Sequence, residues 1–256
     1  MTKNIEIELK SLITNLADLQ IKIESKYDMT RCIKTYSEQL NHYFEGDREA
    51  LLELSTYDSF APYPTATHFD SYLDELLSAN KLTARTRWDS VQGTLLIFKY
   101  SLIDENSVNG TTRKELEFPL PITLEELDSD LLLAGFTYQS KWNRKRTQYS
   151  FESGWNLCLD ENAGFGSILE VEYVATEEEY AAKKDYLMYK AKTFLDTLGL
   201  VELEASLLEQ MFNFYSSRYD EFYGTDKLIW DDTNFLWNRQ GNLKQAPNLL
   251  GEKVIA

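Results

Sequence analysis

The first segment of the chain alternates between apolar and charged residues. Ile5 to Lys10 place isoleucine or leucine on one side and Glu6, Glu8 and Lys10 on the other. Because successive side chains of a strand point to opposite faces, this period of two predicts a half-buried β-strand. Leucine and isoleucine then recur at helical spacing from Leu12 to Ile23, which predicts a short amphipathic helix.

Strand-like runs return in the middle of the chain. They lie at 39–44, 85–88, 94–100, 113–118, 144–151, 155–160 and 168–173. So many short strands favour a barrel or a sandwich. Since helical segments also occur between and after them, the predicted class is α+β.

A Thr-x-x-Glu pattern stands at the start of two predicted helices, at Thr123 and at Thr176. This pattern is typical of a capping box at the start of a helix. The first helix is predicted to end at Gly135 and the second to run toward Gly199, because glycine favours the helix C-cap. A third helix is predicted over 202–215, which makes the C-terminal region helical.

The domain layout follows from these elements. Residues 1–223 are predicted to form one domain, which contains an insertion at about 47–82 with two short helices. Residues 224–256 are rich in Asn, Asp and Gly and form a polar tail of uncertain order.

The charge balance restricts the partners of the chain. Its 42 acidic and 26 basic side chains give a formal net charge of −16. This is the wrong sign for unaided binding of nucleic acid or an anionic membrane. We therefore expect a small-molecule partner, held wherever cations cluster locally.

Cysteine and histidine support no metal site or disulfide framework. Cys32 and Cys158 are far apart in sequence, and His42 and His68 lie in no metal-binding spacing. No stretch approaches the roughly 18 apolar residues that cross a bilayer. We expect a soluble, cytoplasmic protein. The sequence does not decide its oligomeric state, and a homodimer is one of the alternatives.

Charged residues occupy one side of successive predicted strands. Residues two apart in a strand point the same way, and here they often share a sign, as Arg85 with Arg87 and Glu170 with Glu172 do. A solvent-facing side of a sheet would explain any one such pair. Like charges on strand after strand favour a ligand instead, because neighbouring like charges repel without one. The remaining residues of the set are Glu6, Glu8, Lys10, Lys99, Arg113, Glu115, Glu117, Arg144, Arg146 and Asp160.

Both signs in this set have a chemical use. Arginine and lysine bind phosphate oxygens, and carboxylates bind hard divalent ions such as Mg²⁺ or Mn²⁺. If the sheet closes, a channel lined by equal numbers of acids and cations can accept a metal-bound triphosphate without a large charge imbalance. The sequence therefore predicts a site for a triphosphate and a divalent metal.

The order of these residues resembles that of the CYTH family, also called triphosphate tunnel metalloenzymes, over roughly 5–173. The family's first strand reads Glu-x-Glu-x-Lys, and a later strand reads Arg-x-Arg. Glu6, Glu8 and Lys10 match the first and Arg85 with Arg87 the second; further matches are Lys99, Arg113, Glu115, Glu117, Leu159, Asp160, Gly164, Gly166, Glu170 and Glu172. The resemblance implies a closed antiparallel eight-stranded β-barrel with flanking helices.

The resemblance also implies a role for each charged residue. One or two Mg²⁺ or Mn²⁺ ions would bind Glu6, Glu8, Asp160, Glu170 and Glu172. The triphosphate would bind Lys10, Arg85, Arg87, Lys99, Arg113, Arg144 and Arg146. Glu6, Glu8 and Lys10 would be the catalytic residues, and Glu115 and Glu117 are second-rank candidates.

Three functions are compatible with this site. The first is hydrolysis of the terminal phosphate of tripolyphosphate, a nucleoside triphosphate or thiamine triphosphate. The second is conversion of ATP to cyclic AMP by a class IV adenylate cyclase, which a cyclase-like stretch at 198–221 favours and the lack of a His-Phe element before the first strand disfavours. The third is a non-catalytic sensor of polyphosphate or nucleotide. Two departures from the family leave the substrate open: Asn41 replaces a family aspartate, and the insertion at 47–82 is longer than expected. Arg144 replaces a family lysine, so Arg144 and Arg146 are assigned to the phosphates by their position.

Overall fold

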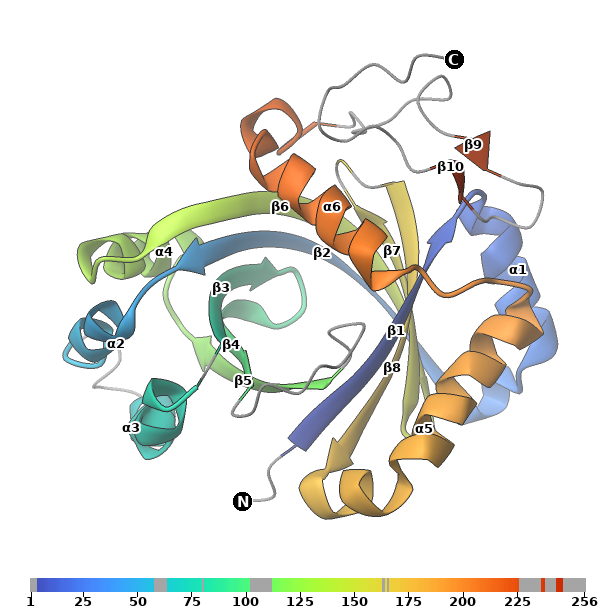
Figure 1. Ribbon diagram of the computed structural model, residues 1–256, viewed down its shortest axis with the longest axis horizontal. Helices are drawn as coiled ribbons and strands as arrows, with labels where there is room; N and C mark the ends of the chain where they lie inside the picture. Colours follow the sequence, from blue (N-terminus) through green and yellow to red (C-terminus); the bar gives the residue numbers. More distant parts are fainter. Residues whose placement is uncertain are drawn as a thin grey trace. The chain divides into compact units, whose positions relative to one another are not determined.

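The computed structural model describes residues 4–57, 64–79, 81–101, 112–162, 164, 166–225, 236–237 and 243–245. Two compact units make up the chain. The first unit contains residues 1–36, 107–112 and 142–256, and the second contains 37–106 and 113–141. The strand order is that of an eight-stranded antiparallel barrel, and helices flank the strands (Figure 1). The predicted α+β class is confirmed.

The first unit packs helices on one face of its strands. β1 pairs antiparallel with β8, β8 with β7, and β7 with β6. Apolar residues of β1 and β8, including Leu9 and Val171, are buried against Leu187 and Leu195 of α5, and Figure 1 shows α5 running along these two strands. The elements are β1 (Asn4–Ile13), α1 (Leu16–Lys26), β6 (Thr137–Phe151), β7 (Trp155–Asn162), β8 (Gly166–Thr176), α5 (Glu177–Leu198) and α6 (Ala205–Ser216), with short 3-10 turns η1 (Met29–Arg31) and η2 (Tyr219–Glu221).

The second unit has the same design. β2 pairs with β3, β3 with β4, and β4 with β5, all antiparallel. Phe98 and Phe118 of the sheet pack against Phe69 and Leu76 of α3, and Leu127 of α4 joins the same core. The elements are β2 (Cys32–Glu45), α2 (Arg48–Leu54), α3 (Pro64–Leu77), β3 (Lys81–Asp89), β4 (Gly93–Ser101), β5 (Thr112–Leu120) and α4 (Leu124–Leu133).

A buried polar network ties α4 to the apolar face of the second unit. Asp128 accepts hydrogen bonds from His42 Nδ1 (2.6 Å), Thr86 Oγ1 (2.6 Å) and Tyr138 OH (2.8 Å). Burial opposes ionisation of Asp128, but these hydrogen bonds hold its pKa below the ordinary value. His42 is thus a structural residue, as its lack of a metal-binding spacing led us to expect.

The helix signals in the sequence are confirmed at both capping boxes. Thr123 and Glu126 exchange the two capping hydrogen bonds at the start of α4. Thr176 caps α5, and Gly199 ends it in the left-handed region at φ +67°. The predicted third helix is α6, which begins at Ala205.

The boundary after the first strand differs from the prediction. Leu12 belongs to β1, which extends to Ile13, and the helix begins only at Leu16. Asn15 sets this boundary, because its side chain accepts a hydrogen bond from the Asp18 backbone N–H at 3.2 Å and caps the helix. Of the predicted tail, 226–235, 238–242 and 246–256 lie outside the described residues; β9 (Leu236–Trp237) pairs there with β10 (Leu243–Gln245).

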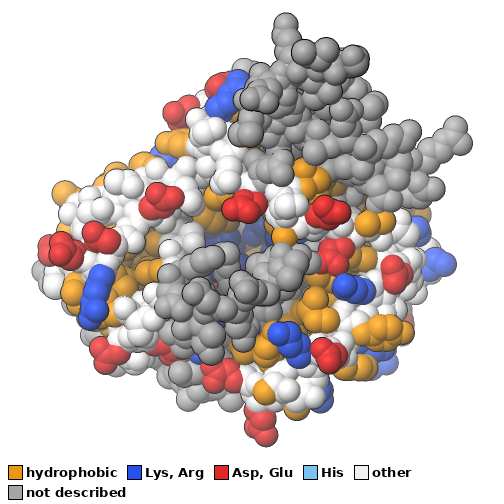
Figure 2. All heavy atoms as spheres, in the orientation of Figure 1, with side chains coloured by type: hydrophobic (Ala, Val, Ile, Leu, Met, Phe, Trp, Pro, Cys, Tyr) orange, Lys and Arg blue, Asp and Glu red, His pale blue; other side chains and the backbone are white. Residues whose placement is uncertain are grey.

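Acidic side chains are spread over the molecular face shown in Figure 2, with lysine and arginine between them. This agrees with the formal net charge of −16. Among the described residues, no helix combines the length and the apolar character needed to cross a membrane.

Candidate functional site

The charged residues of β1 and β8 lie on the strand face opposite the core of the first unit. The register across these two strands places Glu8 opposite Glu172 and Lys10 opposite Glu170. The neighbouring residues Leu9 and Val171 point the other way into the core. The period of two that predicts these strands therefore also gathers their charges on one side.

Three of the predicted metal ligands come together on this face. One carboxylate oxygen from each of Glu8, Glu170 and Glu172 lies within 4.8 Å of the others. Lys10 donates hydrogen bonds to Glu8 and to Glu170. Glu6, two residues before Glu8, adds its negative charge to the surroundings of Glu172.

Asp160 lies beside two arginines. Its carboxylate is fully buried and accepts hydrogen bonds from Nε and Nη2 of Arg146, both at 2.7 Å, and from Nη1 of Arg144 at 2.8 Å. Arg146 also donates to Glu170 and lies 3.5 Å from Glu172. Among the described residues, Asp160 is not part of the three-carboxylate cluster but fixes the two guanidinium groups beside it.

The protonation of the three glutamates differs because their neighbours differ. Burial raises the pKa of Glu172 to about 8, and the charges of Glu170, Glu6 and Glu8 add to this increase against the opposing effect of Arg146. Burial also opposes ionisation of Glu170, but Lys10 and the two arginines hold its pKa well below the ordinary range. The cations therefore offset the charge of Glu170, whereas Glu172 lies among carboxylates whose charges are not fully offset.

These residues fit a divalent cation. The face carries five carboxylates and three cations among the predicted residues, which leaves a formal excess of two negative charges. An ion such as Mg²⁺ or Mn²⁺ prefers oxygen ligands and supplies the missing charge. The carboxylates are those of Glu6, Glu8, Asp160, Glu170 and Glu172, and the cations are those of Lys10, Arg144 and Arg146.

The second unit has a charged face of its own. Glu115 bridges two cations: its Oε1 accepts a hydrogen bond from Arg85 Nη2 at 2.9 Å and its Oε2 lies 2.6 Å from Lys99 Nζ. Arg87 lies 3.5 Å from Glu117. Three cations against two carboxylates leave this face with a formal positive charge, which suits an anion.

Two residues of β2 complete this face. Tyr43 OH accepts a hydrogen bond from Arg85 Nη1 at 3.0 Å, and Asn41 Oδ1 accepts one from Arg87 Nε at 2.9 Å. Arg85 Nε and Asn41 Nδ2 are buried donors without a partner among the described residues. Because buried donors are almost always satisfied, these two N–H groups are able to donate to a further acceptor, such as a water or phosphate oxygen.

Sequence reasoning noted Asn41 only as the replacement of a family aspartate, and it assigned no role to Tyr43. The available signal was their alternation with His42 in β2, which places them on one strand face. It also missed Cys158, whose thiol contacts Glu172 at 3.4 Å and which lies two residues before Asp160 in β7. The side chain of Arg113 lies outside the described residues, so its predicted phosphate contact stays a prediction.

Comparisons with known proteins agree with this architecture. A conserved hypothetical protein from Pyrococcus furiosus matches with a TM-score of 0.52 and 22% identity, over 77% of this chain and 91% of its own. The PH1819 protein from Pyrococcus horikoshii OT3 gives 0.52 and 20%, over 80% and 99%. A candidate adenylate cyclase from Vibrio parahaemolyticus gives 0.50 and 13%, over 78% and 91%. At these identities the likeness concerns the fold.

A search of curated proteins gives no significant match. The model of the CYTH domain matches residues 4–197, a range that includes every predicted site residue. The chain therefore belongs to the CYTH family.

Proposed function

We propose that this protein is a divalent-metal-dependent triphosphatase that releases the terminal phosphate of its substrate. The observation that carries the proposal is the partly buried cluster of Glu8, Glu170 and Glu172 beside Lys10 and Arg146. A carboxylate cluster with an excess of negative charge is suited to bind a metal cation, and the adjacent cations are suited to bind phosphate. The chain belongs to the CYTH family, and the resemblance to that family implies activity on a triphosphate, which agrees with this chemistry.

The residues of the first unit would hold the metal and bind phosphate oxygens. Glu8, Glu170 and Glu172 would be the metal ligands. When bound, Mg²⁺ or Mn²⁺ would polarise a phosphate oxygen and lower the pKa of a water molecule. Arg144 and Arg146, held in place by the buried Asp160, would donate to phosphate oxygens and neutralise charge that develops in the transition state.

The second unit has its own set of cations, which would suit phosphate oxygens. Arg85, Arg87 and Lys99 share one strand face with Glu115 and carry the formal positive excess. In the proposed reaction, water forms a bond to the terminal phosphorus while the bond from that phosphorus to the bridging oxygen breaks. The bridging oxygen leaves with its electron pair on the remaining diphosphate, and orthophosphate is released.

One experiment tests the reaction. Purified protein is incubated with ATP, GTP, thiamine triphosphate and tripolyphosphate, each with Mg²⁺ or Mn²⁺, and the products are resolved by phosphorus NMR. We expect orthophosphate and the corresponding diphosphate. Formation of cyclic AMP and pyrophosphate from ATP would replace the proposal by the cyclase function, and tight binding without turnover would identify a sensor.

A second experiment tests the residues. Glu8→Gln and Glu172→Gln should each lower turnover at least about tenfold if these carboxylates bind catalytic metal. Glu161→Gln is the matched control, because Glu161 is an exposed glutamate on β7, next in sequence to Asp160. Full activity in both site variants would refute the assignment of the cluster.

A further inference from the structure

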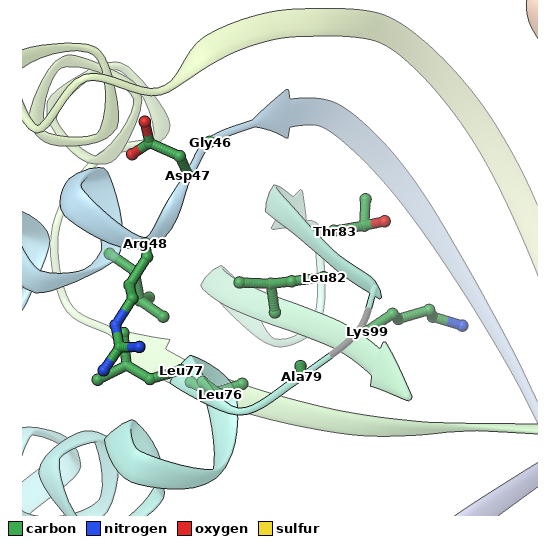
Figure 3. Close-up of a pocket in the computed structure, with 10 residues that line it drawn as sticks. Gly46, Asp47, Arg48, Leu76, Leu77, Ala79, Leu82, Thr83 and Lys99 are labelled. Carbon is green, nitrogen blue, oxygen red and sulfur yellow. The ribbon is translucent and has the colours of Figure 1, made fainter. Parts of the chain in front are cut away.

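A cavity of about 450 Å³ lies within the second unit (Figure 3). Its walls come from α2, from α3 and the turn after it, and from β3 and β4. The volume lies within the range of pockets that bind small molecules. The lining residues with side chains are Asp47, Arg48, Leu51, Leu76, Leu77, Ala79, Leu82, Thr83 and Lys99.

The lining divides into an apolar part and a cationic end. Four leucines, two of them from α3, provide the apolar surface. Lys99 belongs to the charged face already described, where it pairs with Glu115. Figure 3 shows Arg48 beside Leu77 on the helical side of the cavity, while the Lys99 ammonium group points to the opposite side.

Arg48 differs from the other cations of this unit. Its side chain is exposed, and among the described residues it makes no ion pair or hydrogen bond. The preceding residue, Asp47, caps α2 by accepting a hydrogen bond from the Ala50 N–H at 2.9 Å. The guanidinium group of Arg48 is therefore available to a molecule in the cavity.

The cavity also lies at one end of the phosphate-binding row. Thr83 and Lys99 are paired across β3 and β4, and both line the cavity. Arg85 and Arg87 follow Thr83 along the same strand face at steps of about 7 Å. A phosphate chain bound along this row would have one end beside the cavity.

We propose that this cavity binds the heteroaromatic group of an organic triphosphate, such as a nucleobase. This inference rests on the proposed function and narrows its substrate to nucleoside-like triphosphates rather than inorganic tripolyphosphate. Leucine side chains contact the faces of a planar ring favourably, and a guanidinium group stacks on it. A further phosphate would instead lose hydration against the leucines without gaining enough hydrogen bonds.

The inference gives the insertion at 47–82 a role. Helices α2 and α3 supply Arg48, Leu51, Leu76 and Leu77 to the cavity. The insertion would thus select the group that the triphosphate carries, while the strands bind the phosphates common to all such substrates.

Binding of two non-hydrolysable probes tests the inference. The first probe is the ATP analogue with nitrogen between the β- and γ-phosphorus atoms, and the second is inorganic diimidotriphosphate. Both are titrated with Mg²⁺ into the full chain by calorimetry. We expect the wild-type protein to bind the ATP analogue at least about tenfold more tightly, which corresponds to about 1.4 kcal/mol.

Ala79→Trp fills the cavity and should abolish this preference while leaving the dissociation constant of diimidotriphosphate within about twofold. Arg48→Gln should weaken only the ATP analogue. Leu133→Trp is the control, because Leu133 of α4 is 75% exposed and lies outside the lining. Circular dichroism establishes that each variant is folded.

The outcomes separate the inference from the proposed function. Equal wild-type affinity for both probes, or an equal loss of both in folded Ala79→Trp, would overturn the cavity assignment alone. Failure of both probes to bind the wild-type protein would overturn the proposed function together with it. Selective binding of the ATP analogue, lost in Ala79→Trp, would support the cavity assignment even if phosphorus NMR detected no hydrolysis.

Discussion

Replacing Glu172 by glutamine should stabilise the metal-free protein at neutral pH although it removes a candidate metal ligand. Burial, with a further contribution from the charges of Glu170, Glu6 and Glu8, raises the pKa of Glu172 to about 8 from an ordinary value of 4.5. Folding at pH 7 must therefore either protonate this carboxyl or bury its charge. Glutamine has a similar shape and carries no charge, so it avoids this cost.

The size of the effect follows from the pKa difference. One pKa unit corresponds to about 1.4 kcal/mol, so protonating Glu172 on folding costs about 3 kcal/mol at pH 7. A carboxyl group whose folded-state pKa is raised contributes its full stability below the unfolded pKa and loses it as pH rises. Relative to Glu172→Gln, the wild type should lose stability between about pH 4.5 and pH 8.

Urea unfolding in EDTA at several values between pH 5 and pH 8, followed by tryptophan fluorescence, measures this difference. We expect the free energies of unfolding of the two proteins to be close at pH 5 and to diverge toward pH 8. Glu161→Gln should show no such divergence. Mg²⁺ should then stabilise the wild type more than Glu172→Gln, because binding to the folded state adds stability. A difference that does not change with pH, or a less stable glutamine variant at pH 8, would refute this reasoning.

Three further substitutions test the packing around the site. Asp128→Asn removes the charged group that accepts three buried hydrogen bonds, so the free energy of unfolding should fall by about 3 kcal/mol at pH 7. Because folding lowers the pKa of Asp128, the stability that its charge contributes is lost as pH falls below about 4. Urea titrations should therefore show a smaller difference between wild type and variant at pH 3 than at pH 7. Gly46→Ala places a methyl group too close to the Phe136 ring, so it should lower the free energy of unfolding by about 1–3 kcal/mol in thermal unfolding; a neutral result would exclude this close contact. Thr123→Ala deletes the cap of α4 and should cost about 1 kcal/mol by urea unfolding; no change would mean that Glu126 alone suffices as a cap.

Local patterns in the sequence predict most of the strands and helix ends. The alternation from Ile5 to Lys10 identifies β1 because one of its faces is buried, and the capping residues Thr123 and Thr176 identify the starts of α4 and α5. The boundary at Asn15 was missed, since the apolar spacing that begins at Leu12 fits a helix as well as a strand end.

The grouping of the site residues could not be predicted from local patterns. Which carboxylates meet depends on the register of β1 with β8 and of β6 with β7, and this register joins residues far apart in sequence. The family resemblance named Asp160 with the glutamates, whereas the structure places it between Arg144 and Arg146. The cavity beside Lys99 depends on helix packing and has no sequence pattern of its own.

The pairing of β1 with β8 has a consequence for synthesis of the protein. Lys10 and Glu170 are 160 residues apart in the chain, and translation proceeds at roughly 5–20 residues per second. For about 10 to 30 seconds, therefore, the apolar side of β1 has left the ribosome before its partner strand exists. We expect a nascent chain that depends on chaperones during this interval. The cluster of Glu8, Glu170 and Glu172 forms only after β8 has been made.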